Sequence, residues 1–296
     1  HLTACIEVLT FESHRMIHLK THASSGEEYS VDSSNWRENG FMVLTGFFNQ
    51  PQIDSVNRLV DKIWDSRVLS KSRITVDAYL ESSQYKRMLI SSAPNEARLY
   101  PYKINDLFME YEEIRRIVLD KNLRSVLAGL FDGEPIACNS LNFEYGSQQG
   151  AHVDTLYMPP RKQNKLLVSW IALDTVDANN GPVRYYPGSH KIPAYRFRNG
   201  RINAVASEML EFDAYMKNQL AIRGISSQEF TAQPGDVLIW HAQLFHGGTP
   251  ILDESRRRRS LVTHYFRKQD YLHHFWRIRK SESGGFYFRR KHPPVA

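Results

Sequence analysis

The sequence predicts a mainly β domain with flanking helices, an α+β arrangement, because its two halves carry different hydrophobic patterns. Between residues 53 and 64 the apolar side chains recur at three- and four-residue steps, which predicts an amphipathic helix. From about residue 135 onward, short runs rich in β-branched and aromatic residues alternate with Gly, Pro and Asn turns, which predicts a β-sandwich or barrel. Helices therefore come first, and the β structure follows.

The individual elements are expected in the following order. Residues 1–35 are mixed and polar and predict an irregular arm. A second helical stretch is expected over residues 104–130, and one further helix near residues 204–220. The expected strands cover residues 41–44, 140–145, 166–173, 183–186, 237–240 and 260–266.

Length and composition favour one domain after the arm. The chain has 296 residues, of which 42% are hydrophobic and 24% charged, as in an ordinary globular protein. β-sandwich and barrel folds often reach this size as one unit. We expect a single domain over residues 36–296, with helical support at 50–130, a β core at 135–270 and a basic C-terminal tail at 271–296.

Cysteine content and hydropathy bear on the compartment. The sequence holds only Cys5 and Cys138, so a disulfide framework is not expected and a reducing compartment is. The longest apolar run, residues 166–173, is far shorter than the roughly 20 residues of a membrane helix. These features predict a cytoplasmic protein without a membrane span.

The positive charge is concentrated near the C-terminus. The net charge is +6, and basic residues cluster at 256–259 and 277–291. Zinc-finger spacing, an RNP-type strand and a sustained basic helix are all missing from the sequence, so nucleic acid is not an expected partner. A solvated basic tail is the simplest interpretation, and a site for an anionic small molecule is the alternative.

The tripeptide His152-Val153-Asp154 is a candidate pair of metal ligands. On an extended strand, residues i and i+2 project from the same face, so this imidazole and carboxylate can reach one ion. A histidine from another strand would complete a 2-His-1-carboxylate facial triad, which leaves positions open on iron(II). The tripeptide alone is weak evidence, because such triplets arise by chance.

Two histidines are candidates for the third ligand. His246 precedes Gly247 and Gly248, where the backbone can turn sharply and leave room for a bound cosubstrate. His241 ends an apolar strand and is expected to be a hydrogen-bonded structural histidine. We favour His246.

The run of four arginines at residues 256–259 contains a candidate carboxylate-binding group. Guanidinium binds carboxylate through two parallel hydrogen bonds. Arg258 and Ser260 share one face of the following strand by two-residue alternation. Any one arginine in such a run is usually solvent-exposed, so only its surroundings single out Arg258.

Taken together, these pieces make residues 36–270 resemble the phytanoyl-CoA dioxygenase family, including its ectoine hydroxylase relatives. The matching motifs stand in the family's order, and the Pro-Gly-Ser-His stretch after an Asn-Gly-Pro turn is the most specific. They are residues 152–154, 180–182, 186–191, 233–236 and 246–248, and Arg258 with the strand that ends at Tyr265.

The resemblance implies a double-stranded β-helix, a jelly-roll or cupin-like barrel, with iron(II) held by His152, Asp154 and His246. It also implies 2-oxoglutarate as cosubstrate, anchored by Arg258, and O2 as oxidant. The expected reaction hydroxylates an unactivated C–H of a small metabolite and releases succinate and CO2. Halogenating relatives replace the triad carboxylate with a small residue. Asp154 is present here, so hydroxylation or a related oxidation is expected.

Three further positions carry roles only through the resemblance. Arg258 matches the cosubstrate arginine when counted back from Tyr265, whereas counting forward from His246 points to Arg257. Asn142 and Trp170 match positions that line the cosubstrate pocket. Trp170 equally fits a buried aromatic residue without such a role.

Substrate choice lies where the resemblance ends. Residues 161–165 and 196–224 match nothing that can be assigned. Arg161, Lys162 and Lys165 follow Asp154 and favour an organic anion as the small-molecule substrate, although a solvated surface explains them equally well.

Two other functions stay open. One is a cupin-like metal enzyme that does not use 2-oxoglutarate, and the other is a catalytically silent binding protein of the same fold.

Overall fold

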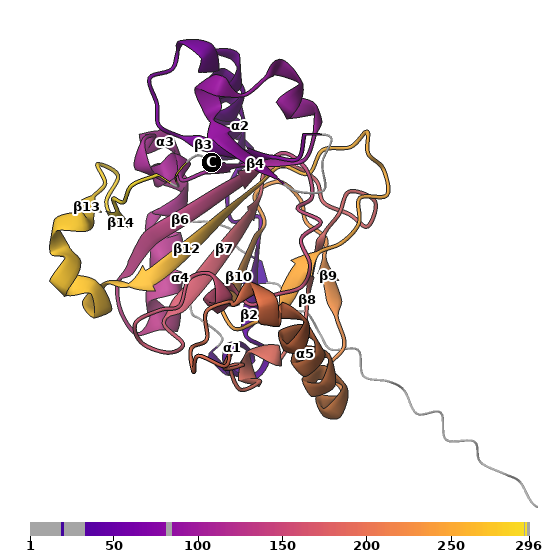
Figure 1. The fold of residues 1–296 in the computed structure, drawn as a ribbon. Helices are drawn as coiled ribbons and strands as arrows, with labels where there is room; N and C mark the ends of the chain where they lie inside the picture. The colour runs from indigo at the N-terminus through magenta and orange to yellow at the C-terminus, as the bar shows by residue number, and fades with distance from the viewer. Residues whose placement is uncertain (1–18, 21–32, 81–84, 293, 295–296) are drawn as a thin grey trace, which may run out of the picture.

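Two facing β-sheets form the centre of the computed structural model, which describes residues 19–20, 33–80, 85–292 and 294 (Figure 1). Within these residues, the larger sheet has eleven strands in the order β1-β2-β10-β7-β12-β6-β5-β3-β4, with β14 also pairing β6 and β13 pairing β14. The smaller sheet has the order β11-β8-β9. Neighbouring strands are antiparallel except β1 with β2 and β14 with β6. The two sheets do not close into one continuous barrel.

The larger sheet consists of β1 (Leu19–Lys20), β2 (Phe41–Thr45), β3 (Thr75–Ala78), β4 (Lys86–Leu89), β5 (Tyr102–Asn105), β6 (Pro135–Phe143), β7 (Leu166–Ala172), β10 (Val237–His241), β12 (Ser260–Arg267), β13 (Ile278–Lys280) and β14 (Phe286–Phe288). The smaller sheet consists of β8 (Val183–Tyr185), β9 (Gln228–Phe230) and β11 (His246–Gly248). The α-helices are α1 (Ser33–Asn39), α2 (Gln50–Asp65), α3 (Glu112–Val118), α4 (Lys121–Phe131) and α5 (Met209–Arg223).

The space between the sheets is filled by apolar side chains from both. Trp170 of β7 and Leu238 of β10 point from the larger sheet toward Tyr185 of β8 and Phe230 of β9. The Trp170 and Phe230 rings meet edge to face, with centroids 5.7 Å apart. This inner core holds the sheets together and forms the wall behind the candidate site.

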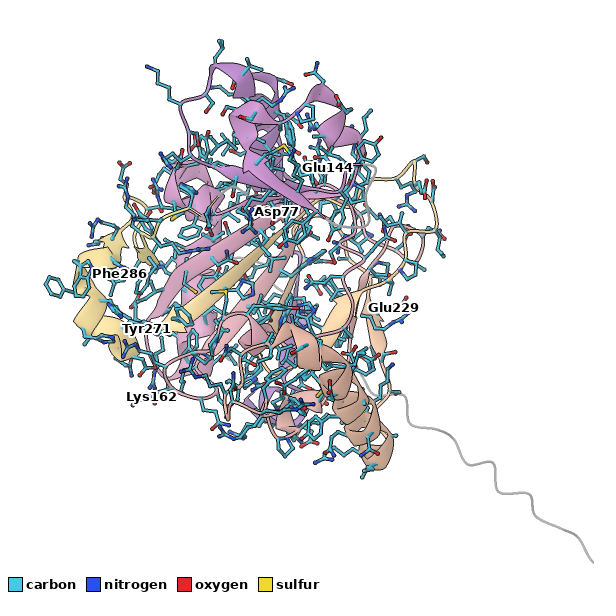
Figure 2. All side chains as sticks on the ribbon, in the orientation of Figure 1. Asp77, Glu144, Lys162, Glu229, Tyr271 and Phe286 are labelled. Carbon is cyan, nitrogen blue, oxygen red and sulfur yellow. The ribbon has the colours of Figure 1, made fainter. Side chains whose placement is uncertain are left out.

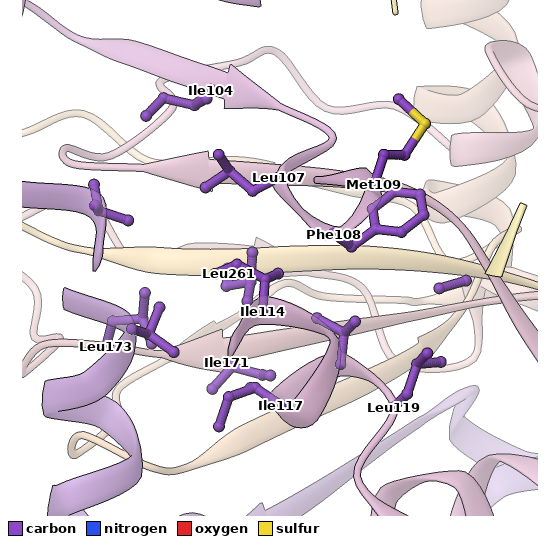
Figure 3. Packing of buried hydrophobic residues seen from close by; sticks show 14 of the residues in the cluster. Ile104, Leu107, Phe108, Met109, Ile114, Ile117, Leu119, Ile171, Leu173 and Leu261 are labelled. Atoms are coloured by element: carbon purple, nitrogen blue, oxygen red, sulfur yellow. The ribbon is translucent and has the colours of Figure 1, made fainter. Parts of the chain in front are cut away.

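The opposite face of the larger sheet is covered by helices. Ile114 and Ile117 of α3 pack toward Ile171 of β7 and Leu261 of β12 (Figure 3). Burying side chains of this size stabilises the fold by about 1.5–3 kcal/mol each. The helical layer therefore fixes the sheet from outside, while the inner face stays available for polar groups.

The strands predicted from the sequence are confirmed as β2, β6, β7, β8, β10 and β12, and the helices predicted from residues 53 and 204 as α2 and α5. The single helix predicted over residues 104–130 is wrong. Residues 102–105 form β5, and two helices follow, because the Asp120 side chain accepts hydrogen bonds from the amides of Asn122 and Leu123 and starts α4 anew.

The two ends of the chain are described to different extents. Of the predicted N-terminal arm, most lies outside the described residues. The predicted basic tail is folded as far as it is described: it forms the end of the 3₁₀ segment η8 (Lys268–Arg277), then β13 and β14. β14 pairs with β6 in register Phe286 to Ile136, and Arg290 forms an ion pair with buried Asp106 at 2.6 Å. No helix in the described part of the chain has the length and apolar content needed to cross a membrane.

Candidate metal and carboxylate site

Three predicted ligands meet between the sheets. His152, Asp154 and His246 are buried, and one ligand atom from each lies within 4.8 Å of the others. His152 and His246 exchange backbone hydrogen bonds of 2.7 and 3.0 Å, which fixes the distance between their segments. The tripeptide is not a continuous strand as predicted, because Asp154 begins the 3₁₀ turn η5 (Asp154–Leu156). Val153 is extended, so both flanking side chains still point the same way.

The two imidazoles are oriented through their second nitrogen. His152 Nδ1 lies 2.9 Å from the Gly150 carbonyl oxygen, and His246 Nδ1 lies 2.9 Å from the Leu244 carbonyl oxygen. Each Nδ1 therefore carries the proton and donates it, which leaves the Nε2 lone pair facing inward. Both Nε2 atoms lie 3.8 Å from Asp154 Oδ1. This is the pattern of histidines prepared to bind a metal ion.

Two residues that the sequence analysis missed hold Asp154. Trp240 Nε1 donates to Asp154 Oδ2 at 2.8 Å, and His264 Nε2 lies 3.3 Å from Oδ1. His264 has a sequence signal, since it lies six residues after Arg258 and so shares its face of β12. No sequence pattern points to Trp240, because its hydrogen bond to Asp154 joins a strand to a loop far away in the sequence.

The protonation states suit metal binding. Burial, followed by the neighbouring His246, lowers the pKa of His152 to about 4, so it is neutral and can coordinate at neutral pH. Burial by itself raises the pKa of Asp154, but the adjacent His246 and His264 imidazoles outweigh it and hold that pKa below its usual range. A neutral histidine and an ionised carboxylate are the forms that bind a metal ion.

The glycines after His246 have a different role from the predicted one. A Cβ atom at Gly247 would lie 2.9 Å from the Gln149 carbonyl oxygen, and one at Gly248 would lie 2.7 Å from the Gln148 amide nitrogen. Backbone atoms of the segment before His152 therefore occupy the space beside both glycines, so this space is not left for a cosubstrate. The glycines allow the segment before His152 to approach β11 closely.

His241 lies apart from the cluster. Its Nδ1 accepts a hydrogen bond from the Gln243 amide at 3.0 Å, and its ring packs 5.5 Å from that of His190. These are the surroundings of a structural histidine.

Arg258 is buried, and no acidic side chain among the described residues pairs with it. Its side chain points between the sheets, with the guanidinium carbon 5.4 Å from the centre of the Trp170 ring. Its guanidinium makes a long hydrogen bond of 3.5 Å from Nη2 to the Tyr145 carbonyl oxygen. In the part of the chain described, its Nε and the neighbouring Ser260 Oγ are both buried without a hydrogen-bond partner. Burial lowers the pKa of Arg258 to about 10, so it is still charged at neutral pH. These donors fit a carboxylate ligand.

The adjacent arginines point outward. Arg257 and Arg259 form ion pairs with Glu144 at 3.1 and 2.9 Å, and Arg256 pairs with Asp177 at 2.7 Å. The orientation thus distinguishes Arg258 from Arg257, which the sequence left as an alternative.

Asn142 lies on the other face of the sheet. It is opposite Leu261 and Ile104, both of the core beneath the helices, so its side chain does not face Arg258. Its Nδ2 donates to the Ser260 carbonyl oxygen at 3.4 Å. A direct contact between Asn142 and a ligand held by Arg258 is therefore not supported by this placement.

A cavity of about 870 Å³ opens beside the three candidate metal ligands. His152, Asp154 and His264 are among the residues that line it. Its walls are aromatic and cationic side chains, among them Tyr85, Arg87, Lys103, Tyr157, Phe266, Tyr271, Phe288 and Arg290. Among the described residues that line it, none of the predicted Arg161, Lys162 and Lys165 occurs. Lys165 instead donates to the Phe131 carbonyl oxygen at 2.8 Å.

Two facing, mainly antiparallel sheets around a His-Asp-His cluster define the class: a double-stranded β-helix with a candidate facial-triad metal site. The chain belongs to the phytanoyl-CoA dioxygenase (PhyH) family, whose sequence pattern matches residues 36–259. The predicted family and fold class are thereby confirmed.

Relatives by sequence are distant. Peroxisomal phytanoyl-CoA dioxygenase of Bos taurus is 23% identical over 223 residues, which cover 72% of this chain and 61% of the bovine protein. A phytanoyl-CoA dioxygenase domain-containing protein 1 homolog of Caenorhabditis briggsae is 22% identical over 192 residues, which cover 55% of this chain and 66% of that protein. The match thus spans less than two thirds of the relatives' length.

Solved structures share the fold. EctD from S. alaskensis, solved with 2-oxoglutarate and 5-hydroxyectoine, superimposes with a TM-score of 0.59 at 17% identity, covering 93% of this chain and 89% of EctD. The carbocyclase SnoK from nogalamycin biosynthesis gives a TM-score of 0.59 at 17% identity, covering 86% of this chain and 94% of SnoK. The epimerase SnoN, solved with Fe3+ and alpha ketoglutarate, gives 0.57 at 13% identity, covering 79% and 81%.

Proposed function

We propose that this protein is an iron(II)- and 2-oxoglutarate-dependent dioxygenase that hydroxylates an unactivated C–H of a small metabolite and releases succinate and CO2. The observation that carries the proposal is the combination of a buried His152-Asp154-His246 cluster with a buried arginine, Arg258, that has no acidic partner among the described residues. The names of the bovine relative and the ligands of EctD and SnoN support the same reaction class.

The donor set fits iron(II) and 2-oxoglutarate. Two imidazoles and one carboxylate leave coordination positions for a chelating cosubstrate and for O2. Bound iron and 2-oxoglutarate would supply the oxidising power for hydroxylation, with O2 as the oxidant. Arg258 and the Ser260 hydroxyl would donate hydrogen bonds to the far carboxylate of the cosubstrate.

The surrounding residues have supporting roles. Trp240 and His264 hold the two oxygens of Asp154, so that Oδ1 faces the imidazoles. Trp170 provides an aromatic wall beside Arg258 and keeps water from its charge. Asn142 acts only indirectly, through its hydrogen bond to the Ser260 carbonyl oxygen.

The substrate is proposed to carry a carboxylate or phosphate. Arg87 and Lys103 line the cavity and share one carboxylate, that of fully buried Asp77, at 2.6 and 3.8 Å. Asp77 lies on β3, which pairs with β4, and is labelled in Figure 2. Two cations with one anion leave a net positive charge in that wall, which would attract an anionic ligand.

The reaction class is tested by loading the protein with iron(II) and incubating it with 2-oxoglutarate and a metabolite extract. We expect succinate and a product heavier by one oxygen, both lost in Asp154→Ala. A product without succinate would identify a metal enzyme that does not use 2-oxoglutarate. Neither product nor succinate would identify a silent binding protein.

The substrate's charge is tested with the compound found in that extract. Its affinity should weaken as salt rises, and should fall about tenfold in Lys103→Gln, the loss of one favourable charge contact. Lys162→Gln is the matched control, because Lys162 is exposed and outside the cavity lining. Equal affinities in both variants, flat in salt, would contradict an anionic substrate.

A further inference from the structure

The segment η8 exposes a group of large apolar side chains next to the cavity. Leu272, Phe275 and Trp276 are 55%, 71% and 53% exposed, which is unusual for three such residues within five positions. The rings of Phe275 and Trp276 contact each other edge to face, with centroids 5.7 Å apart. We call these three residues the η8 apolar patch.

Basic side chains border this patch. Arg279 Nη1 donates to the Trp276 carbonyl oxygen at 2.6 Å, which folds the guanidinium back beside the aromatic pair. On the other side, the Trp276 ring contacts His274, and His274 Nε2 lies 3.1 Å from Arg161 Nη2. Lys280 is exposed as well.

Nearby acidic residues offset this charge only in part, because Glu282 is exposed but Asp270 is already paired. Asp270 is the only acidic residue between positions 268 and 280. Its buried carboxylate is held by Arg267 through two hydrogen bonds of 2.8 and 2.9 Å. The patch is therefore an apolar centre with a positive rim.

Its position limits what can bind there. The segment η8, between β12 and β13, projects at the edge of the molecule (Figure 1). It contains Tyr271 and lies near Phe286, both labelled in Figure 2. Tyr271, His274 and Arg277 of the same segment line the cavity, so the patch borders the cavity's mouth. The family pattern ends at residue 259, so this segment is outside the part matched to the family.

We propose that the η8 apolar patch binds peripherally to an anionic membrane surface. Trp, Phe and Leu are the side chains that enter the lipid interface, and flanking Arg and Lys are attracted to anionic headgroups. A second copy of this chain is a poor occupant, because a two-fold contact would bring two positive rims together. The proposal goes beyond the oxygenase function and does not depend on it.

Sedimentation with lipid vesicles tests it. The full chain should bind phosphatidylcholine vesicles with about 30% phosphatidylserine and bind pure phosphatidylcholine much more weakly, because each basic residue near an anionic surface contributes about fivefold. The double variant Arg279→Gln and Lys280→Gln should lower the partition coefficient by on the order of 25-fold, about fivefold for each charge removed. Phe275→Ser with Trp276→Ser should abolish binding.

Tryptophan fluorescence gives an independent measurement. Trp36, Trp64, Trp170 and Trp240 are buried or half-buried, so a blue shift on adding vesicles reports Trp276. Trp276→Phe should lose the shift and keep the sedimentation.

Leu69→Ser with Leu210→Ser is the matched control, since these residues are 87% and 83% exposed elsewhere. It should bind vesicles like the unmodified protein. The proposal fails if the protein binds neither type of vesicle, or if the patch variants bind vesicles as well as the control variant does. It also fails if Phe275→Ser converts a dimer into a monomer, since a second copy would then cover the patch.

Discussion

Two clusters of buried charge lie close together in this protein and are satisfied in opposite ways. On the outer side, Glu144 is 1% exposed and accepts from Tyr102 at 2.6 Å while pairing with Arg257 and Arg259. Between the sheets, Arg258 has no acidic partner in the described structure. Leaving a buried charge unpaired costs several kcal/mol. The outer cluster is complete without a ligand, whereas the inner one is suited to receive one.

The largest expected contrast is between Asp154→Ala and Glu144→Ala. Asp154→Ala removes one of three proposed ligands and its charge, so turnover should be lost and iron affinity should fall by more than about 100-fold, beyond the effect of losing a supporting residue. Glu144→Ala leaves Arg257 and Arg259 without their shared partner. Arg259 keeps its ion pair with Asp61 and Arg257 is half-exposed, so the free energy of unfolding should fall by about 1–3 kcal/mol.

Iron titration and urea unfolding, applied to both variants, check this contrast. Full 2-oxoglutarate turnover in Asp154→Ala would refute the triad. An unchanged unfolding free energy in Glu144→Ala would remove the structural role of the outer cluster.

The two histidines on neighbouring segments sharpen the comparison. His246→Ala should lose iron, because its Nε2 faces Asp154, whereas His241→Ala should keep it. Metal content after gel filtration distinguishes them. Retention of iron in His246→Ala with loss in His241→Ala would reverse the assignment.

Among the arginines, Arg258→Ala should raise the concentration of 2-oxoglutarate required for turnover tenfold to hundredfold, since a charge-assisted pair contributes about 1.5–3 kcal/mol. Arg257→Ala should change it little, because Arg257 pairs with Glu144 outside. If Arg257→Ala raises the requirement instead, the two arginines must exchange roles.

Replacing Arg258 by an apolar residue should also change the free energy of unfolding, in a direction that its lowered pKa predicts. A cation whose pKa is lowered on folding costs stability at every pH below its folded pKa, here about 10. Arg258→Met should therefore leave the ligand-free protein at least as stable at pH 7, by thermal unfolding. A large loss of stability would show that Arg258 has a partner that supports the fold.

The smallest effect is expected for Trp240→Phe, which keeps the aromatic ring and removes only the hydrogen bond to Asp154 Oδ2. Iron affinity should fall about tenfold, as for other residues that orient a ligand. A fall as large as that of Asp154→Ala would mean that Trp240 does more than orient the carboxylate.

Local patterns were sufficient where a local rule decides the structure. The apolar period gave α2, and β-branched runs gave β2, β6, β7, β8, β10 and β12. Residues 152–154 and 246 were identified as candidate ligands because ordered motifs carried the family resemblance. The unpredicted strands β3, β4 and β5 are short and mixed in composition, and they form by pairing in series beyond β6, where Val76 and Ile104 are buried in the core.

The sequence by itself determined α2, α5 and six of the strands, the family, and the residue types available for a metal and a carboxylate. Only the tertiary structure decided which of them act together. Arg258 differs from Arg257 because one faces Trp170 and the other faces Glu144. Trp240 reaches Asp154 across 86 positions of the chain. The physical reason is that burial and partner distance, which set charge and orientation, come from residues far apart in sequence.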